Sequence, residues 1–455
     1  MLTESEKFSV RDRIAHALDY RPDEGVYRLA RNIFTDPEIF ELEMEHIFER
    51  TWVFACHESL IPNPGDFYTV KIGRQPMIIT RDKDGAIHAL VNACIHRGTT
   101  LARVRKGNAN LFSCPYHAWT YRNDGQLMGV KEPGGYSADF KVKDKCLKKG
   151  VVANYRGFIF VNLDPSTAVP IEEFLGEAKR FIDLIVNQSP TGELEVVPGS
   201  SVYTYDGNWK LQNENGVDGY HVTTVHSSWV STLANRWKLD SATKAAPDTF
   251  DATKIDSAPP GANGWFVFDN GHSVLFNEIP NPSVRAGYSG VYPRLVEQYG
   301  KDFAYWSMCK ARNLGIYPSV ILFDQISTQI RVVRPIAWNK TEINSYCLGV
   351  KGESAVDREK RIRQFEDFFN VSGMGTPDDL VEFREAQEGF QGRNDKWSDI
   401  SRGHAMWSLT PTPAAQAIQV KPALSGPDWS MEGIFVKQHK RWQDLLLTRM
   451  EKPSA

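Results

Sequence analysis

The sequence predicts an α+β protein with two domains: a small all-β domain, then a larger domain in which helices cover an antiparallel sheet. Three observations support this prediction. At 455 residues, the chain is longer than a single hydrophobic core usually supports. Short apolar segments separated by hairpin turns occupy residues 41–160, whereas residues 161–455 combine amphipathic helices with strands. Residues 1–40 are expected to form an N-terminal arm that packs on the larger domain.

The end of the arm and the small domain carry clear local signals. Thr35-Asp36-Pro37 predicts the start of a helix, with proline at an early position and acidic residues in the first turn. Two segments, Asp82–Gly85 and Arg122–Gly125, have the composition of hairpin turns. The strands predicted around them are Phe67–Ile72, Met77–Thr80, Ile87–Val91 and, closing the domain, Tyr155–Asn162.

Two Cys-His pairs lie on loops at the ends of these strands. Cys94 and His96 form the first pair, Cys114 and His117 the second, in the order C-x-H-x17-C-x2-H. A Rieske [2Fe-2S] cluster needs this set, with two thiolates on one iron and two imidazoles on the other. The alternative is a zinc site, but zinc-finger spacing normally closes with H-x3–5-H after a cysteine pair. The mixed pairs favour the cluster.

The larger domain is predicted to contain one antiparallel sheet. Amphipathic helices are expected over residues 171–186 and from about Val356 to Phe369. The periodicity predicts the strands Val202–Tyr205, Trp265–Phe268, His272–Phe276, Ser319–Phe323, Gln329–Arg334 and Glu342–Leu348. Strands of this alternating or apolar pattern suggest a single sheet covered by the long helix.

A second constellation, with the spacing D-x2-H-x4-H, is formed by Asp218, His221 and His226. Positions five apart on a helix lie about 140° apart, so a local distortion is needed for both imidazoles to meet one ion. Two imidazoles and one carboxylate make the facial triad of a mononuclear non-heme iron(II) oxygenase. An isolated histidine pair is more often a packing feature, but electrons from an upstream cluster need a destination. Asp218 is well placed to orient the imidazole of His221 without binding the metal itself.

The third ligand of such a triad must be a carboxylate. Asp378 and Asp379 are adjacent acids at the predicted start of a helix that follows the long helix. Simple N-capping would explain them equally well, because aspartate favours the positive end of the helix dipole. Both roles can hold, with Asp378 as the cap and Asp379 as the ligand. The sequence leaves this choice open.

The composition excludes several other classes of function. The net charge of −3 provides no electrostatic footprint for nucleic acid or an anionic membrane. Apolar runs long enough for a membrane span are absent from the sequence, and Met1–Glu6 is acidic and unlike a signal peptide. Outside the Cys-His pairs, the cysteines expected to be reduced are Cys56, Cys146, Cys309 and Cys347. These features predict a cytoplasmic protein without nucleic-acid or membrane partners.

With these motifs, the chain resembles the large (α) subunits of Rieske non-heme iron aromatic-ring-hydroxylating dioxygenases over nearly its whole length. Cys-x-His-Arg-Gly at 94–98 and Cys-Pro-Tyr-His-x-Trp at 114–119 match the cluster motif. Glu-Asn-x-x-Asp-x-Tyr-His-x4-His at 214–226 matches the iron motif, with an interval one residue shorter than in naphthalene-type enzymes, as in the benzoate branch. The acids at 378–379 match the third-ligand segment, whose second aspartate is the ligand in the family. Ala118 departs from the family, which usually has glycine there.

The resemblance implies the cofactors and their ligands. It implies a Rieske [2Fe-2S] cluster and a mononuclear Fe(II), with Asp218 coupling the two centres through His221. NADH electrons would arrive through a separate flavin and iron–sulfur reductase. A small β subunit is common in the family, so an α3 or α3β3 oligomer is expected. The implied ligands are Cys94, His96, Cys114 and His117 for the cluster, and His221, His226 and Asp379 for the iron.

Blocks outside the metal motifs place the chain in the benzoate and anthranilate branch of the family, nearest to the members that act on anthranilate. They include Gly207–Gly216, Asn270–Phe276 and Arg334–Glu342. The resemblance implies a terminal oxygenase that dihydroxylates an aromatic carboxylate with O2, converting anthranilate to catechol with loss of CO2 and ammonia. Benzoate, toluate, 2-halobenzoate or aniline dioxygenation stays open, and so does a Rieske monooxygenase. A simple electron carrier would need only the small domain.

An aromatic carboxylate substrate needs a partner in its pocket. Burying a carboxylate without a hydrogen-bond donor or a cation would cost several kcal/mol. A one-residue change in strand register decides which side chains face the pocket, so the sequence does not rank the candidates. They are Gln325, Gln329, Arg331, Asn370 and Ser372.

Overall fold

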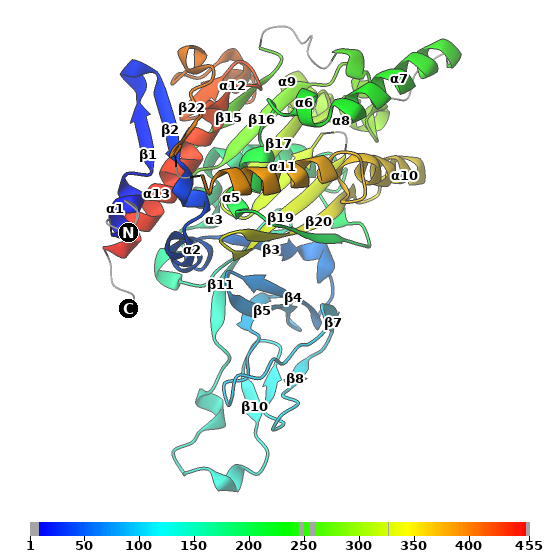
Figure 1. The fold of residues 1–455 in the computed structure, drawn as a ribbon. Helices are drawn as coiled ribbons and strands as arrows, with labels where there is room; N and C mark the ends of the chain where they lie inside the picture. Colours follow the sequence, from blue (N-terminus) through cyan, green and yellow to red (C-terminus); the bar gives the residue numbers. More distant parts are fainter. Residues whose placement is uncertain (1–8, 245–249, 255–260, 326, 393, 452–455) are drawn as a thin grey trace. The chain divides into compact units, whose positions relative to one another are not determined.

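In the computed structural model, the chain forms two compact units (Figure 1). One unit contains Met1–Glu43 and Leu175–Ala455, and the other contains Met44–Phe174. The structure describes residues 9–244, 250–254, 261–325, 327–392 and 394–451, so the first eight residues of the predicted arm lie outside it. No helix within these described ranges is both long and apolar enough to cross a membrane. None of the six cysteines, all of which lie in the described residues, forms a disulfide bond.

The small unit is all β, as predicted. Its main sheet is antiparallel, and a smaller antiparallel sheet has the order β10-β9-β8. The main sheet has the order β3 (Val53–His57), β12 (Phe158–Asn162), β11 (Lys149–Tyr155), β6 (Ile87–Val91), β5 (Gln75–Arg81), β4 (Asp66–Ile72) and β7 (Lys106–Asn108). The smaller sheet contains β8 (Leu111–Ser113), β9 (Thr120–Arg122) and β10 (Leu127–Gly129).

One predicted strand of this unit is wrong. The segment Tyr155–Asn162 is not a single closing strand, because the chain reverses at Arg156 and Gly157, where φ is 53° and 93°. Their positive φ values make the tight turn that pairs β11 with β12. The unit also continues past residue 160, since Nε1 of Trp52 donates a hydrogen bond to the carbonyl oxygen of Val169 at 2.8 Å.

The larger unit contains the predicted antiparallel sheet, which has nine strands within the described residues. Eight of these strands follow one another in a continuous order, and the ninth, β14 (Ser201–Tyr205), pairs with β20 outside this order. That order is β13 (Leu194–Val196), β20 (Lys340–Val350), β19 (Thr328–Ala337), β18 (Val320–Asp324), β17 (Lys310–Ile316), β16 (Ser273–Glu278), β15 (Gly264–Val267) and β22 (Leu424–Gly426).

Strand β17 was not predicted from the sequence. It contains Lys310, Arg312 and Asn313, whose polar side chains do not suggest a buried strand, yet all three are buried. Arg312 and Arg285 share Asp324 on the neighbouring strand, and Asn313 donates to the carbonyl oxygen of Gly216 at 2.8 Å. These partners make burial of the polar strand possible.

The helices that carry the site lie against this sheet (Figure 1). Helix α5 (Trp209–Asn215) contacts β19, and α11 (Thr376–Gly389) contacts α5 and β14. The predicted helix 356–369 consists of α10 (Ala355–Gln364) and a π-helical turn at Phe365–Phe369. Further helices of the chain are α3 (Ile171–Leu175), α4 (Lys179–Val186), α6 (Val222–Val225), α7 (Ser227–Thr243), α8 (Tyr288–Tyr299), α9 (Lys301–Met308) and α12 (Pro413–Ala417).

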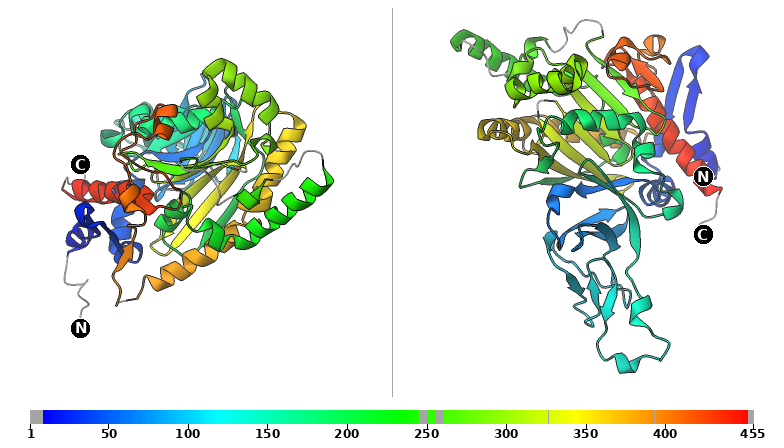
Figure 2. Two further views of the ribbon diagram at one scale, coloured as in Figure 1. Left: turned by 90° about the horizontal axis from the view of Figure 1, so that it is seen from above. Right: turned by 180° about the vertical axis from the view of Figure 1, so that it is seen from behind.

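The N-terminal arm is paired with the C-terminal part of the chain. In both views of Figure 2, α1 (Val10–Ala15) lies beside α13 (Val436–Met450), whose Gln443 donates to the carbonyl oxygen of Ile14 at 2.9 Å. The predicted helix of the arm is α2 (Pro37–Glu43), where Asp36 accepts from the first-turn backbone N–H groups. The arm also contributes to a three-stranded sheet of β1 (Leu18–Arg21), β2 (Val26–Ala30) and β21 (Trp397–Asp399).

Candidate metal centres and active-site pocket

His221, His226 and Asp379 meet in the larger unit. One donor atom from each residue lies within 4.8 Å of the other two. His221 precedes the one-turn helix α6, and His226 follows it with φ −98° and ψ 27°, outside the helical region. This break before α7 supplies the distortion that the five-residue spacing requires. Asp379 comes from the first turn of α11.

The distances between these ligand atoms suit a single ion. Oδ1 of Asp379 lies 3.2 Å from Nε2 of His226 and 3.6 Å from Nε2 of His221. Two atoms about 2.1 Å from one metal ion and 90° apart are about 3.0 Å from each other. The three atoms can therefore occupy one face of an octahedral ion and leave the opposite positions open.

Asp218 lies next to this group without belonging to it. Its Oδ2 accepts a hydrogen bond from Nδ1 of His221 at 2.9 Å, which leaves Nε2 of the ring facing Asp379. Its Oδ1 accepts from the backbone N–H of Tyr220 at 2.7 Å. Gly219 allows this turn, because a Cβ there would lie 2.6 Å from the carbonyl oxygen of Trp429. The geometry is that of a carboxylate that orients a ligating imidazole.

Asn215 is a site residue whose role was not predicted from the sequence, although it belongs to the Glu-Asn motif. Its Nδ2 donates to Oδ1 of Asp379 at 3.1 Å and lies 3.3 Å from Nε2 of His221. The residue ends α5, three positions before Asp218, and this position in the Glu-Asn motif was the only available signal. Asn215 thus connects the α5 segment to the carboxylate on α11.

The two adjacent acids of α11 are in different environments. The side chain of Asp379 is 9% exposed, whereas that of Asp378 is 38% exposed and approaches His226 only at Nδ1, at 3.7 Å. Of the roles left open by the sequence, N-capping by Asp378 does not occur, because the N-cap of α11 is Gly375 and Asp378 lies inside the first turn. Glycine is needed there, since the ring of Phe368 packs where a Cβ would project.

The electrostatics of the group favour an ionised carboxylate. Burial alone raises the pKa of Asp379, but its hydrogen bond with His226 and the nearby imidazole and Arg331 charges outweigh burial and lower that pKa overall. For His221 the directions are reversed: burial alone lowers its pKa, but the hydrogen bond from its ring to Asp218 and the charge of that carboxylate raise the pKa overall. An anionic oxygen next to two ring nitrogens is a donor set suited to a divalent cation.

A pocket of about 900 Å³, counting the open solvent at its mouth, surrounds this group. Polar side chains reach it from β16, from β17 and from the end of β18, as Asn277, Asn313 and Gln325. Aromatic side chains form part of its walls and include Trp229, Phe250, Phe323, Phe368 and Phe369. Such walls fit the faces of an aromatic ring.

The structure separates the five residues proposed for binding a substrate carboxylate. Gln325 and Arg331 line the pocket. Gln329, Asn370 and Ser372 are not among the described residues that line it. Oε1 of Gln329 accepts from the hydroxyl of Ser345 at 2.9 Å, and Oδ1 of Asn370 accepts from the backbone N–H of Val371 at 2.8 Å.

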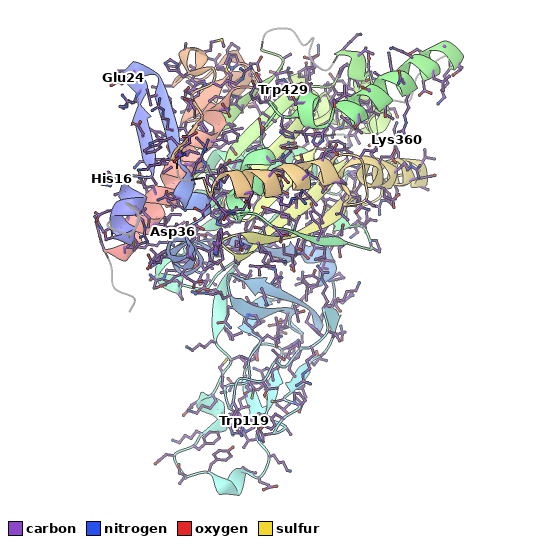
Figure 3. The ribbon with its side chains drawn as sticks, in the orientation of Figure 1. His16, Glu24, Asp36, Trp119, Lys360 and Trp429 are labelled. Carbon is purple, nitrogen blue, oxygen red and sulfur yellow. The ribbon has the colours of Figure 1, made fainter. Side chains whose placement is uncertain are left out.

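The two Cys-His pairs meet in the small unit, on the loops between β6 and β7 and between β8 and β9. Cys94 and Cys114 are buried, each 3% exposed, in a core that contains Trp119. The rings of His96 and His117 have centroids 4.6 Å apart, and His96 stacks on Trp119, which is labelled in Figure 3. The sequence prediction that both pairs lie on loops at strand ends is confirmed.

Two further residues shape these loops. The hydroxyl of Tyr121 lies 3.2 Å from Sγ of Cys94 and accepts from the backbone N–H of Ile95 at 3.3 Å. Ala118 has φ of 56° and donates its N–H to the carbonyl oxygen of Cys114 at 2.9 Å. This left-handed position explains why glycine suits it, and alanine there costs about 1–2 kcal/mol.

Comparisons with known proteins agree with this geometry. Residues 51–143 match the family model of the Rieske [2Fe-2S] domain, and residues 193–403 match that of the ring hydroxylating alpha subunit (catalytic domain). The chain is 57% identical to the anthranilate 1,2-dioxygenase large subunit of Acinetobacter baylyi, over 96% of this chain and 93% of that protein. It is 45% identical to the toluate 1,2-dioxygenase subunit alpha of Pseudomonas putida, over 97% and 96%. Naphthalene 1,2-dioxygenase from Rhodococcus sp., bound to indole, is similar with a TM-score of 0.83 and 25% identity over 100% of both chains.

The chain belongs to the Rieske ring-hydroxylating dioxygenases. It is the large, α-type subunit of that family and an oxidoreductase, so the predicted fold class and family are confirmed. Members of the family carry a Rieske [2Fe-2S] cluster and a mononuclear iron. They work with a reductase and often with a β subunit.

The residues of this dioxygenase subunit fit both groups. Nδ1 of His117 is buried and has no hydrogen-bond partner among the described residues. It lies in the same pair of loops as two buried thiols, which is the mixed donor set of a Rieske cluster. In the larger unit, two imidazoles and one buried carboxylate provide the donor set of a mononuclear iron.

Proposed function

We propose that this chain is the catalytic subunit of an anthranilate 1,2-dioxygenase. The reaction converts anthranilate, O2, NADH and two protons to catechol, CO2, ammonia and NAD⁺. The observation that carries the proposal is the 57% identity to the Acinetobacter baylyi large subunit over nearly the whole chain. The aromatic walls of the pocket around the three ligand residues are consistent with a single-ring substrate.

In this proposal each metal group has its own ligand set. When bound, the iron activates O2 and the cluster delivers the electrons that this chemistry consumes. Asp218 has a positioning role, because it holds the ring of His221 with Nε2 directed at the metal position. The proposed ligands are His221, His226 and Asp379 for Fe(II), and Cys94, His96, Cys114 and His117 for the cluster.

The remaining steps require little further protein chemistry. Dihydroxylation at the carboxyl-bearing and amino-bearing carbons gives a diol that can lose CO2 and ammonia and become aromatic again. The pocket walls, including Phe323, Phe368 and Phe369, would hold the ring and exclude water while this happens. A dedicated acid–base pair is therefore not part of the proposal.

The proposal includes an assembly of α3 or α3β3 in the cytoplasm, served by an NADH-dependent flavin and iron–sulfur reductase. In such a ring, the cluster of one subunit would face the iron of its neighbour, and Asp218 would bridge the two centres through His221 and His117 of the adjacent copy. The family's use of a reductase, and often of a β subunit, supports this part of the proposal.

A substrate panel with the reconstituted reductase tests the function. Anthranilate, benzoate, 2-chlorobenzoate, salicylate and aniline are compared for O2 consumption and product. We expect catechol from anthranilate, with both oxygen atoms derived from labelled O2, and about three irons per chain from the proposed ligand sets. Turnover of benzoate to its diol without catechol from anthranilate would contradict the proposed substrate. A single labelled oxygen in the first product would indicate a monooxygenase.

A further inference from the structure

Arg331 is a buried cation in the wall of the active-site pocket. It lies on β19, opposite Ile321 of β18, and it is 2% exposed. Its guanidinium carbon lies 5.0 Å from the ring centroid of Phe323 and 5.7 Å from that of Phe369, and both rings line the same pocket. Arg331 therefore sits where the ring of an aromatic substrate and its substituents would lie.

The hydrogen-bonding capacity of Arg331 is only partly used. One terminal nitrogen donates to Oε1 of Gln212 at 3.3 Å, and the other donates to the hydroxyl of Thr376 at 3.2 Å. Both partners are neutral, and both bonds are long for a charged donor. Nε is buried and has no hydrogen-bond partner within the described residues. A guanidinium has five N–H donors, so most of its capacity remains for a ligand.

Arg285, the other arginine in the pocket wall, is in a different state. Its guanidinium forms an ion pair with Asp324 at 2.5 Å and donates to the carbonyl oxygens of Ser307 and Lys310, both at 3.2 Å. Its charge and donors are thus engaged inside the protein. Among the described residues, no carboxylate forms an ion pair with Arg331.

The charge balance of the pocket also leaves Arg331 without a counterion. The acids that line the pocket are Asp218 and Asp379. A bound Fe(II) would carry two positive charges, which balance these two carboxylates. The positive charge of Arg331 then remains uncompensated next to the rings of Phe323 and Phe369, and an anionic substrate group would neutralise it.

The position of Arg331 matches the reaction. Thr376, to which it donates, lies three residues before Asp379 in the first turn of α11. In the proposed dioxygenation, the carboxyl-bearing carbon is itself oxygenated, so the carboxylate must lie close to the metal ligands. A cation one helical turn from the ligating carboxylate meets this requirement.

We propose that Arg331 binds the carboxylate of the aromatic substrate and so selects aromatic acids over neutral arenes. The proposal rests on the proposed function and names the residue that recognises its substrate class. Gln325, the other surviving candidate, already donates its amide to Oδ1 of Asn313 and carries no charge. The planar guanidinium group of Arg331 can also donate two parallel hydrogen bonds to the two oxygens of a carboxylate.

Equilibrium dialysis of the purified protein, oxidised and without reductase, tests this proposal. Binding of anthranilate and benzoate is compared with binding of aniline, which lacks the carboxylate. In Arg331→Gln, the Kd for both acids is expected to rise about 10- to 150-fold, the value of a charge-assisted hydrogen bond, while the Kd for aniline changes less than about 3-fold. Arg331→Lys keeps the positive charge but lacks the planar guanidinium group. The increase in Kd for the acids should therefore be smaller than in Arg331→Gln.

The controls separate the alternatives. Gln325→Leu removes the neighbouring amide, and a loss of acid selectivity there, but not in Arg331→Gln, would overturn the assignment. Iron is measured in each variant, because loss of iron with equal weakening of acids and aniline would mean that Arg331 only holds Thr376 and α11 in place. If Arg331→Gln does not fold, the same Kd values are measured for Arg331→Lys. A preference of Arg331→Lys for acids over aniline that equals the wild-type preference would then overturn the proposal. Wild-type protein that binds aniline but no aromatic acid would instead overturn the proposed function.

Discussion

A buried ion pair connects α2, the helix of the N-terminal arm, to α5, the helix in which the iron motif begins, and its removal is a sharp test of the structure. Oε1 of Glu43 accepts from Nζ of Lys210 at 2.5 Å and from Nε1 of Trp442 at 2.7 Å. Oε2 accepts from Nε1 of Trp209 at 2.7 Å. Glu43 is fully buried and Lys210 is 1% exposed, so the pair has no access to water. In this way Glu43 joins α2, α5 and α13.

We expect Glu43→Gln to destabilise the larger unit by about 3–5 kcal/mol, because it leaves Lys210 buried without a counterion. Burial already lowers the pKa of Lys210, and Glu43 opposes that effect. Without Glu43, the lysine can escape only by losing its proton. From an ordinary pKa of about 10.4, this costs about 4.6 kcal/mol at pH 7, which bounds the loss. For a unit of about 320 residues, the expected fall in Tm is about 4–7 °C.

Thermal unfolding followed by calorimetry measures this change, with a double variant as the control. Glu43→Gln combined with Lys210→Met removes the buried charge, so it should be more stable than Glu43→Gln alone. The pH dependence has a defined sign. A folded-state lysine with a depressed pKa binds fewer protons than the unfolded chain, so the stability of Glu43→Gln should rise by about 1.4 kcal/mol per pH unit above pH 7. A loss below about 1 kcal/mol, or a double variant no better than the single one, would refute this reasoning.

The remaining predictions concern the metal sites. Asp379→Ala should lower the iron content from about three to about two per chain, whereas Asp378→Ala should keep all three, as measured by metal analysis. Asp218→Asn should keep both metals and a reducible cluster, while turnover falls about 10- to 100-fold. Tyr121→Phe removes the hydroxyl that lies 3.2 Å from Sγ of Cys94, so the potential of the cluster should fall by about 20–65 mV in a redox titration.

Each of these predictions has an outcome that contradicts it. Equal loss of iron in Asp378→Ala and Asp379→Ala would contradict the assignment of Asp379 as the single carboxylate ligand. Full turnover in Asp218→Asn, or iron loss as severe as in His221→Ala, would rule out a positioning role. An unchanged potential in Tyr121→Phe would show that the phenol does not donate to the sulfur when the cluster is bound.

The sequence alone was informative where the interacting atoms are near neighbours in the chain. Cys94 and His96, like Cys114 and His117, are separated by so few residues that a single loop must hold both members of a pair. The same holds for Asp218 and His221, which the structure joins at 2.9 Å. Hairpin turns and alternating strands were also predictable, because they reflect local backbone preferences.

The local sequence pattern did not predict elements whose burial depends on partners far away in the chain. Strand β17 looks polar, and distant partners such as Asp324 on the next strand and the carbonyl oxygen of Gly216 make its burial favourable. The turn at Arg156 and Gly157 was also missed, because a positive φ at a residue other than glycine has no reliable sequence signal.

Only the tertiary structure decided which members of equivalent candidates face the site. Asp378 and Asp379 are adjacent and chemically identical, but successive residues on a helix point about 100° apart, so one carboxylate meets both imidazoles and the other faces solvent. Gln329 and Arg331 project from the same face of β19, yet only Arg331 reaches the pocket. The sequence by itself determined the family and its metal-binding chemistry, since short ligand spacings encode them. The pairing of the strands and the docking of α11 determined which carboxylate meets the imidazoles and which cation faces the substrate pocket, because these depend on contacts between segments far apart in the chain.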